Sequence, residues 1–257
     1  MGSFEPAGGG FFFKIVLELM LLLMLNMSHH KSVIKINFKE FIIKMKKVFK
    51  LLLILSCQII VAQNDYFEKG NSLLQQNKYK QAQKIFEIGL KENPKNLMYK
   101  NQIALALINQ GKNNDAEEII KKVLEVDSLN VAALWYGGIN NFMAKDSDFK
   151  KAILYFEKAY PLIDKGSGQF FGVNFFIGKS YRNLLYSEGL SFEETDRMLE
   201  TLEKYTELQP NAEDYKDTIA FINYIKEKRP PKNVKNWVIA SSEKKADEII
   251  KKELETN

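Results

Sequence analysis

The sequence has very few of the side chains that most enzymes use for chemistry. The chain of 257 residues contains one cysteine, Cys57, and two histidines, His29 and His30, and all three lie before position 63. Beyond that position the chain therefore has no thiol nucleophile, no disulfide, no histidine base and none of the commonest zinc ligands. We expect no catalytic residues, no metal site and no cofactor.

A net charge of one sign is also missing from most of the chain. The formal net charge is +5, and the eight lysines and three glutamates within positions 1–62 account for all of it. The remaining chain is neutral, although its overall content of charged residues is high. A neutral domain lacks the basic patch that nucleic-acid binding requires, so we expect no nucleic-acid partner.

Two apolar runs set the N-terminal part of the chain, positions 1–62, apart. The first covers residues 11–27 and contains Lys14 and Glu18. The second, residues 48–62, follows a lysine cluster and ends in a small residue, which is the layout of a secretory signal peptide starting at Met45. It is shorter than the roughly 20 residues of a transmembrane helix. The pattern predicts an upstream segment over residues 1–44, a signal peptide over residues 45–62, and export to the periplasm or cell envelope.

Two alternatives for this leader stay open. Residues 11–27 could act as a signal anchor, with the lysine-rich stretch 31–50 in the cytoplasm by the positive-inside rule. Residues 54–57, Ile-Leu-Ser-Cys, resemble a bacterial lipobox, which would attach a lipid to Cys57. The apolar residues 58–62 argue against a soluble linker after that cysteine. A membrane would be contacted only through the leader or such a lipid anchor.

Three alanines follow a nearly fixed spacing in the remaining chain. Ala82 and Ala116 are separated by about 34 residues, a period typical of repeated helical hairpins, and Ala152 follows after a slightly longer interval. Around them, helical patterns repeat small, aromatic and helix-breaking residues in the same order; the first unit contains Tyr66, Gly70, Leu73, Tyr79, Ala82, Phe86, Gly89 and Pro94. This order resembles the tetratricopeptide repeat, in which an Ala-x3-Phe element precedes a closing proline. The resemblance implies an all-α, right-handed solenoid of stacked helical hairpins.

The repeats predict four units with a cap. Their expected ranges are 63–96, 97–130, 131–166 and a divergent 169–210, followed by a capping helix over 211–228 and a linker with a C-terminal helix over 229–257. The interval from Gly178 to Pro210 in the fourth unit is longer than the matching interval from Gly70 to Pro94 in the first. Lys100 and Asn174 occupy aromatic positions, and Asn141 replaces a tyrosine. Trp237, in the linker, is expected to pack on the last repeat, or else to belong to a partner-binding tail.

Two short motifs resemble an enzyme motif and a dinucleotide-binding site, but each has a simpler structural explanation. Ser241 to Lys244 matches Ser-x-x-Lys, but the other elements of penicillin-binding enzymes are missing, and an N-cap serine explains it. Residues 166–172 are rich in glycine, yet no strand precedes them, as a dinucleotide site would require. We interpret them as the loop between the third and fourth units.

Solenoids of this kind build binding surfaces, so the function expected from the resemblance is non-catalytic binding of a protein or peptide partner. The first helix of each hairpin should line a groove that holds a peptide or a helix. By helical spacing, this partner-binding groove presents Phe67, Asn71, Gln75, Asn101, Leu105, Asn109, Trp135, Ile139, Phe142, Phe175, Lys179 and Arg182. Its aromatic residues replace the charged groups of the carboxylate clamp found in some relatives. A lipid-anchored assembly factor and a hydrolase are the alternatives.

Overall fold

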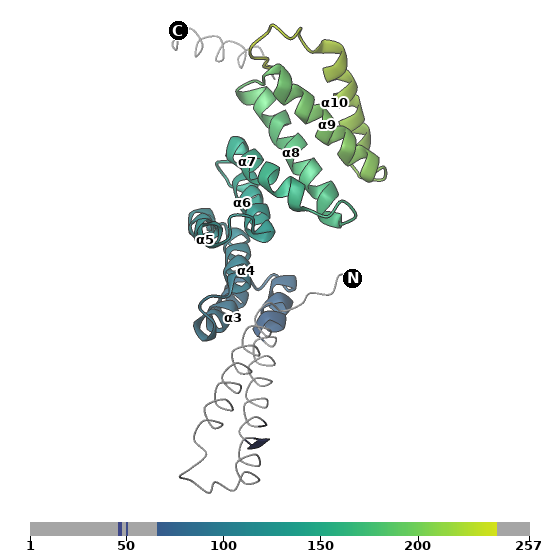
Figure 1. Ribbon diagram of the computed structural model, residues 1–257. Helices are drawn as coiled ribbons and strands as arrows, with labels where there is room; N and C mark the ends of the chain where they lie inside the picture. The colour runs from purple at the N-terminus through teal and green to yellow at the C-terminus, as the bar shows by residue number, and fades with distance from the viewer. Residues whose placement is uncertain (1–45, 48–49, 51–65, 241–257) are drawn as a thin grey trace, which may run out of the picture. The chain divides into compact units, whose positions relative to one another are not determined.

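The structure is a computed structural model that describes residues 46–47, 50 and 66–240 (Figure 1). It divides the chain into two units, Met1–Val61 and Ala62–Asn257, and the second is described here. The predicted upstream segment, Cys57 and the helix expected after Ser241 lie outside the described residues. Of the predicted signal peptide, only Lys46, Lys47 and Lys50 lie within them.

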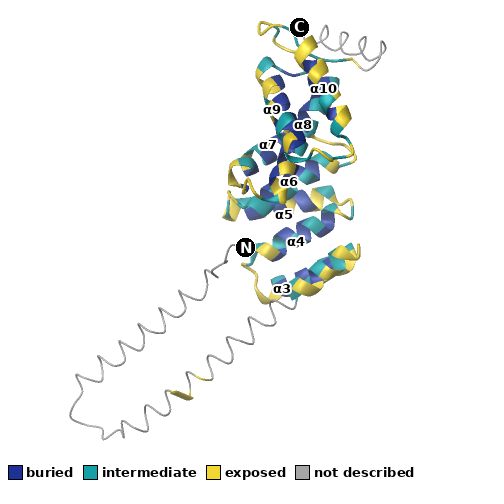
Figure 2. Ribbon diagram, turned by 90° about the vertical axis from the view of Figure 1, so that its right-hand side faces the viewer, coloured by how far each residue is buried: buried dark blue, intermediate teal, exposed yellow. Residues whose placement is uncertain are grey.

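Helical hairpins follow one another along the described part of the second unit (Figure 2). In the first hairpin, the helical residues 66–75 precede α3 (Tyr79–Glu92). The later elements are α4 (Leu97–Ile108), α5 (Asn113–Val126), α6 (Val131–Met143), α7 (Phe149–Ala159), the 3-10 turn η1 (Tyr160–Leu162), α8 (Gly168–Ser187), α9 (Phe192–Leu208) and α10 (Tyr215–Lys228). Each helix packs against the next one in the chain. The predicted all-α solenoid is confirmed.

Local sequence signals start and stop these helices. Asn96 and Asn130 precede α4 and α6, and each side chain accepts a hydrogen bond from a backbone N–H of the first turn, which satisfies an otherwise unpaired donor. The tight turns inside the first two hairpins need a left-handed residue, supplied by Asn77 (φ 58°) and Gly111 (φ 71°). Such turns keep the hairpin connections short, so the two helices of each unit are antiparallel neighbours.

The repeated small residues allow the two helices of a hairpin to pack closely. A Cβ on Gly138 would lie 2.5 Å from ring atoms of Phe156, and one on Gly178 would lie 2.6 Å from the side chain of Leu202. In the first hairpin, Phe86 covers Gly70 in the same way. Glycine is therefore required at these three positions, where a large residue of the second helix lies across the first.

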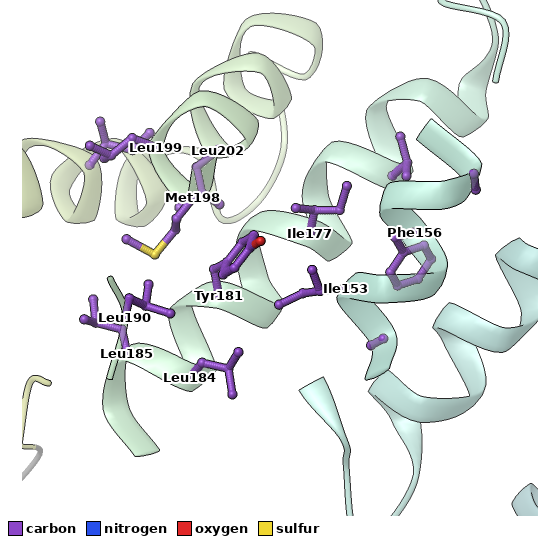
Figure 3. Packing of buried hydrophobic residues seen from close by; sticks show 14 of the residues in the cluster. Ile153, Phe156, Ile177, Tyr181, Leu184, Leu185, Leu190, Met198, Leu199 and Leu202 are labelled. Atoms are coloured by element: carbon purple, nitrogen blue, oxygen red, sulfur yellow. The ribbon is translucent and has the colours of Figure 1, made fainter. Parts of the chain in front are cut away.

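The buried side chains of residues 66–240 form three hydrophobic clusters in chain order. One joins the first hairpin to α4, a small one joins α4 and α5 to α6, and the largest extends from α6 and α7 to α10. Figure 3 shows the largest, where Ile177 and Tyr181 of α8 lie between Ile153 of α7 and Met198 of α9. Each hairpin thus buries its apolar face against neighbours, as a solenoid requires.

The fourth hairpin differs from the sequence-based expectation. Its additional residues lengthen the helices, since α8 has 20 residues and α9 has 17, against 12 in α4 and 14 in α5. The glycine-rich stretch 166–172 is not a loop throughout, because α8 begins at Gly168. Leu202 lies over Gly178 in the packing position that a phenylalanine holds in the first and third hairpins. A capping box begins α9, in which the side chains of Ser191 and Glu194 each accept a hydrogen bond from the other residue's backbone N–H.

The cap also begins later than predicted. It is α10, which starts at Tyr215, and its buried residues are Thr218, Phe221, Ile222 and Ile225. The outer face is polar, as a terminal repeat needs. None of the helices in the described ranges is both long and apolar enough to span a bilayer.

Residues 229–240, here called the strap, are not a free linker. Leu190 and Trp237 form an antiparallel bridge with two backbone hydrogen bonds of 2.8 Å, and Ile239 N–H donates to the carbonyl of Leu185 at 2.9 Å. At the other end, the guanidinium of Arg229 stacks 3.8 Å from the ring centre of Phe192. The expectation that Trp237 packs on the last repeat is confirmed.

Candidate binding face

The first helices of the hairpins lie side by side. α4 contacts α6 directly. α6 contacts α8 through aromatic rings, since Phe176 lies 5.8 Å from Trp135 and 5.1 Å from Phe142 between ring centres. Side chains on the outward side of these helices therefore form one continuous surface, which we call the first-helix face.

The middle of this face is uncharged and largely apolar. Helical spacing places Met98, Gln102, Leu105 and Asn109 on one stripe of α4, and Ala132, Tyr136, Ile139 and Met143 on the matching stripe of α6. Met98 is 50% exposed and Met143 66% exposed, while Leu105 and Ile139 are half-buried. α6 contains no charged residue at all. A surface of this composition favours apolar partner segments over charged ones.

In the first hairpin, the predicted groove residues serve different purposes. Phe67 packs its ring 6.2 Å from Phe86 and 6.3 Å from Tyr99, so it belongs to the core. Asn71 is half-buried and Gln75 is exposed at the end of its helix. Of the three groove residues predicted here, only these two amides remain as polar groups for a partner.

In the second hairpin, one of the predicted groove residues does not face the groove. Asn101 is buried and donates from Nδ2 to Oδ1 of Asn130 at 2.9 Å, so it braces the junction with α6. Leu105 is half-buried, and the exposed Asn109 donates from its amide to the Leu105 carbonyl at 2.9 Å. The physical reason for the difference is that Asn101 faces the next hairpin.

In the third hairpin, the predicted aromatic anchors pack within the molecule. Trp135 meets Phe156 edge-on at 5.6 Å, and Phe142 meets Phe149 at 5.6 Å. Ile139 also packs against the largest cluster. All three predicted residues are half-buried. Because a partner would find only part of each side chain, shortening Trp135 or Phe142 would test packing before it tested binding.

In the fourth hairpin, two of the three predicted groove residues contact the cap. Lys179 Nζ pairs with Oδ2 of Asp214, just before α10, at 2.8 Å, and the guanidinium of Arg182 lies 4.3 Å from the ring centre of Phe221. Phe175 packs its ring 5.0 Å from that of Tyr205. The available first-helix face is therefore limited to the first three hairpins.

The sequence-based selection omitted the two exposed methionines of the face. Met98 and Met143 lie at the beginning of α4 and at the end of α6. The selection began at Asn101 in α4 and ended at Phe142 in α6, so it stopped about one turn short of Met98 and one residue short of Met143. Helical spacing extended by one turn toward each end would have identified both.

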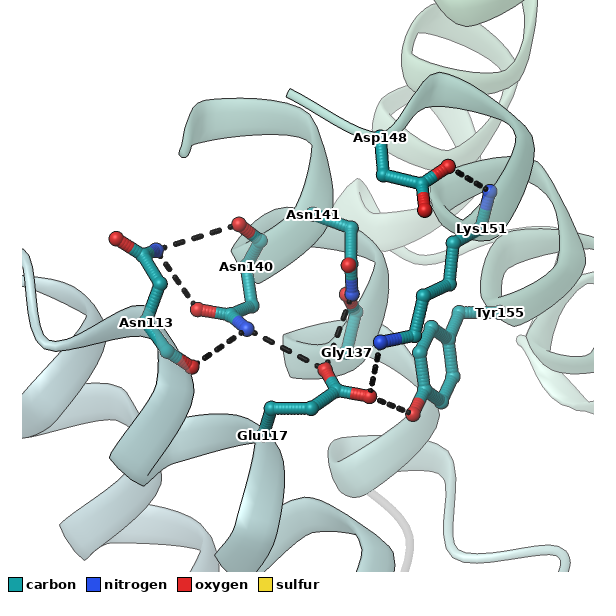
Figure 4. A network of polar contacts seen from close by, with 8 residues as sticks. All are labelled: Asn113, Glu117, Gly137, Asn140, Asn141, Asp148, Lys151 and Tyr155. Atoms are coloured by element: carbon teal, nitrogen blue, oxygen red, sulfur yellow. Dashed lines mark hydrogen bonds and ion pairs between the residues drawn. The ribbon is translucent and has the colours of Figure 1, made fainter. Parts of the chain in front are cut away.

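A buried polar network lies at the junction of the second and third hairpins (Figure 4). Oε1 of Glu117 pairs with Lys151 Nζ at 2.6 Å and accepts from the Tyr155 hydroxyl at 2.8 Å, while Oε2 accepts from Asn141 at 3.1 Å and from Asn140 at 3.3 Å. This explains why asparagine replaces the usual tyrosine at position 141. The network joins hairpins, and its carboxylate oxygens are fully used within the fold.

The protonation of this network follows from its contacts. Burial alone would raise the pKa of Glu117, but hydrogen bonds from Lys151, Tyr155 and Asn141, with the lysine charge, lower that pKa below its ordinary value. Burial, together with the adjacent carboxylate, raises the pKa of Tyr155. Glu117 is thus ionised and Tyr155 neutral at neutral pH. Among the described residues, no group of three or more His, Cys, Asp or Glu side chains could hold a metal ion.

Comparison with known proteins gives a consistent picture. The family model of the tetratricopeptide repeat matches residues 73–136. The fold is similar to that of a solved structure of MamA from Desulfovibrio magneticus RS-1, with 18% identity, a TM-score of 0.52 and coverage of 76% of this chain and 94% of that one.

Two further solved structures share the fold. One is pilF of Pseudomonas aeruginosa, with 19% identity, a TM-score of 0.54 and coverage of 66% and 71% of the two chains. The other belongs to the Naa15/Naa10 complex bound to HypK-THB, with 18% identity, a TM-score of 0.50 and coverage of 76% and 25%. No curated protein sequence matches the chain. Residues 73–136 therefore match the tetratricopeptide repeat, and the described residues share their fold with these solved structures.

Proposed function

We propose that this protein is a non-catalytic interaction scaffold that binds a peptide or a helix of a partner protein on its first-helix face. The observation that supports this most directly is the uncharged stripe on α4 and α6, with Met98 and Met143 exposed at its ends. Methionine side chains adapt to varied apolar surfaces. The matching occupant is an amphipathic helix that turns its apolar side toward the stripe.

The charged residues of the fourth hairpin restrict the kind of partner further. Lys179 and Arg182 are the basic residues predicted for the groove, and both are used by the cap. A partner that is recognised mainly through a terminal carboxylate would find no free cation at these two positions. The amides of Asn71 and Gln75 beside the stripe suit the polar edge of a helix or the backbone of an extended peptide.

The test is affinity capture with cross-linking, using the chain and a variant with Met98→Glu and Met143→Glu as baits. Both side chains are exposed, so the fold should persist while the face becomes acidic. A matched control carries Val126→Glu and Leu154→Glu, which are 70% and 63% exposed outside the stripe. The proposal predicts that an enriched partner disappears from the first variant only. Equal capture by both variants would place binding elsewhere.

We also propose export to the periplasm or cell envelope through residues 45–62. The sequence pattern of the leader supports this, because a lysine cluster is followed by a short apolar run that ends in a small residue. A lipid-anchored envelope assembly factor, lipidated at Cys57, is the alternative. Mass measurement of the mature N-terminus separates the two. A start near Gln63 supports the signal peptide, a lipid mass on an N-terminal Cys57 supports the anchor, and an unprocessed chain contradicts both.

A hydrolase is the least supported function. The buried carboxylate of Glu117 uses both of its oxygens for an ion pair and hydrogen bonds within the described part of the chain. A nucleophile with an adjacent base and a third orienting group is the arrangement that hydrolysis would need. Hydrolytic activity of the purified chain that a single serine or glutamate substitution abolishes would revive this alternative.

A further inference from the structure

The methionines after position 62 divide between the first-helix face and the core. They are Met98, Met143 and Met198. Met98 and Met143 are exposed, whereas Met198 of α9 is completely buried in the largest hydrophobic cluster (Figure 3). The two accessible methionines of residues 66–240 therefore both lie on the proposed binding surface, one on α4 and the other on α6.

The two exposed methionines contribute to this surface and not to the packing beneath it. The three hydrophobic clusters of residues 66–240 include Met198 but neither Met98 nor Met143. A change of polarity at these two side chains would thus alter the face and leave the core in place. The other aliphatic members of the stripe, Leu105 and Ile139, are half-buried hydrocarbons that dilute peroxides do not attack.

The thioether of methionine is readily oxidised by peroxides. A lone pair of the sulfur attacks one oxygen of hydrogen peroxide, the O–O bond breaks and an S–O bond forms, and after a proton shift the second oxygen leaves as water. The sulfur loses two electrons, which reduce the peroxide. The product, methionine sulfoxide, is polar where the thioether was apolar. Methionine sulfoxide reductases restore the thioether with the electrons of a dithiol, and the oxygen leaves as water.

We propose that Met98 and Met143 form a peroxide-sensitive modification site that reversibly converts the first-helix face from apolar to polar, which rests on the proposed function of that face. The two residues lie at the beginning of α4 and at the end of α6, so sulfoxides at both positions place a polar group at each end of the stripe. Burial of such a group against an apolar partner without a hydrogen bond is unfavourable. Oxidation therefore weakens binding of the partner, and a reductase restores it.

The first experiment measures which methionines react. The full chain is treated with dilute hydrogen peroxide under native conditions, and peptide mass spectrometry follows the gain of one oxygen at each methionine over time. We expect Met98 and Met143 to react at least tenfold faster than Met198, because peroxide reaches the buried sulfur only when the core opens. In urea the three rates should converge. Equal rates in the folded chain, with unchanged circular dichroism, would overturn the proposal.

The second experiment measures the polarity of the surface without any partner. On a hydrophobic-interaction column, the oxidised chain should elute earlier than the untreated chain, and treatment with a methionine sulfoxide reductase should restore its retention. The matched control is the double variant Met98→Leu and Met143→Leu, which keeps an apolar face and every other sulfur of the chain. Its retention should shift less than half as far after peroxide. An equal shift in both chains would assign the change to other residues and contradict the proposal.

Partner capture then separates this inference from the proposed function. After peroxide, the unmodified chain should capture at least fivefold less of the enriched partner, whereas the double leucine variant should capture as much as before treatment. If the retention shift occurs but the untreated chain captures no partner, the proposed function fails and the modification site stands. If the untreated chain captures a partner and oxidation leaves capture unchanged, the control of binding by oxidation fails and the proposed function stands.

Discussion

At the scale of single residues, the junction between the second and third hairpins depends on one carboxylate. Glu117 of the second hairpin receives contacts from both helices of the third, and the nearby Glu118 on the same helix turns to solvent. Removing a buried charge from such a network leaves its donors unpaired, which costs more than the pair itself contributes. The two neighbours therefore form a natural comparison of a buried and an exposed glutamate.

We predict that Glu117→Gln lowers the free energy of unfolding at neutral pH by about 3 kcal/mol, because Lys151 loses its partner. Since the folded-state pKa of Glu117 is lowered, its contribution is fully present above the unfolded pKa of about 4.5 and is lost as the pH falls through the folded value. Urea unfolding from pH 7 to pH 3 measures this, and the variant should show the weaker pH dependence below pH 5.

The matched control is Glu118→Gln. Its ion pair with Lys122 is exposed on both sides, at 69% and 59% of the two side chains, so screening by solvent should leave the unfolding midpoint unchanged. If Glu117→Gln behaved like this control at every pH, the network would not stabilise the junction.

A second residue-scale prediction concerns the close approach of the hairpin helices. Gly138→Ala places a Cβ as near to the Phe156 ring as 2.5 Å, so the ring or the helix must shift. Overpacking of this kind costs about 1–3 kcal/mol. The control Gly166→Ala meets nothing closer than 3.7 Å. Thermal unfolding of both variants should show a loss for Gly138→Ala alone; equal midpoints would mean that the hairpin is loosely packed.

The repeated pairs of small and large residues could be predicted from the sequence, because the two members of each pair lie in the same hairpin. Gly138 and Phe156 lie on the two helices of one unit and meet wherever such a hairpin forms. The contacts of Asn101 and Lys179 could not be predicted in this way. Their partners, Asn130 and Asp214, belong to the start of the next hairpin and to the cap. The outcome therefore depends on the angle between units, which no local pattern encodes.

At the scale of elements, the strap and the lengthened fourth hairpin pack together and depend on each other. The additional residues of α8 and α9 carry the turn at Gly189 (φ 87°) to a place where Leu190 can bridge Trp237. The sequence indicated an insertion and a tryptophan separately. Their pairing could not be predicted, because a single antiparallel bridge has no periodic signal.

We predict that Trp237→Ala frees the strap and lowers the free energy of unfolding by about 2 kcal/mol, the effect of removing a half-buried aromatic side chain. The more specific readout is hydrogen exchange, in which the amide of Leu190 should lose protection as its acceptor, the Trp237 carbonyl, moves away. Lys235→Ala, on the exposed side of the strap, is the control. Unchanged protection of Leu190 in the tryptophan variant would show that the bridge holds without it.

At the scale of the described domain, stability should be distributed in segments. The hydrophobic clusters follow the chain, with Phe86 in the first and Ile225 in the last. In a solenoid, each hairpin contacts only its neighbours, so the two ends can lose structure separately. The largest cluster includes α8, α9 and α10, while the first hairpin has a smaller one.

The final prediction uses this segmentation. Phe86→Ala opens a cavity in the first cluster and should cost about 3–5 kcal/mol locally, with hydrogen-exchange protection lost from residues 66–108 and retained in α8 and α9. Ile225→Ala, buried at the opposite end, should give the reverse pattern. A uniform loss of protection in both variants would mean that the domain unfolds as a single cooperative unit. Since the first-helix face extends over the first three hairpins, such local opening at Phe86 would weaken binding there while leaving the cap and the strap intact.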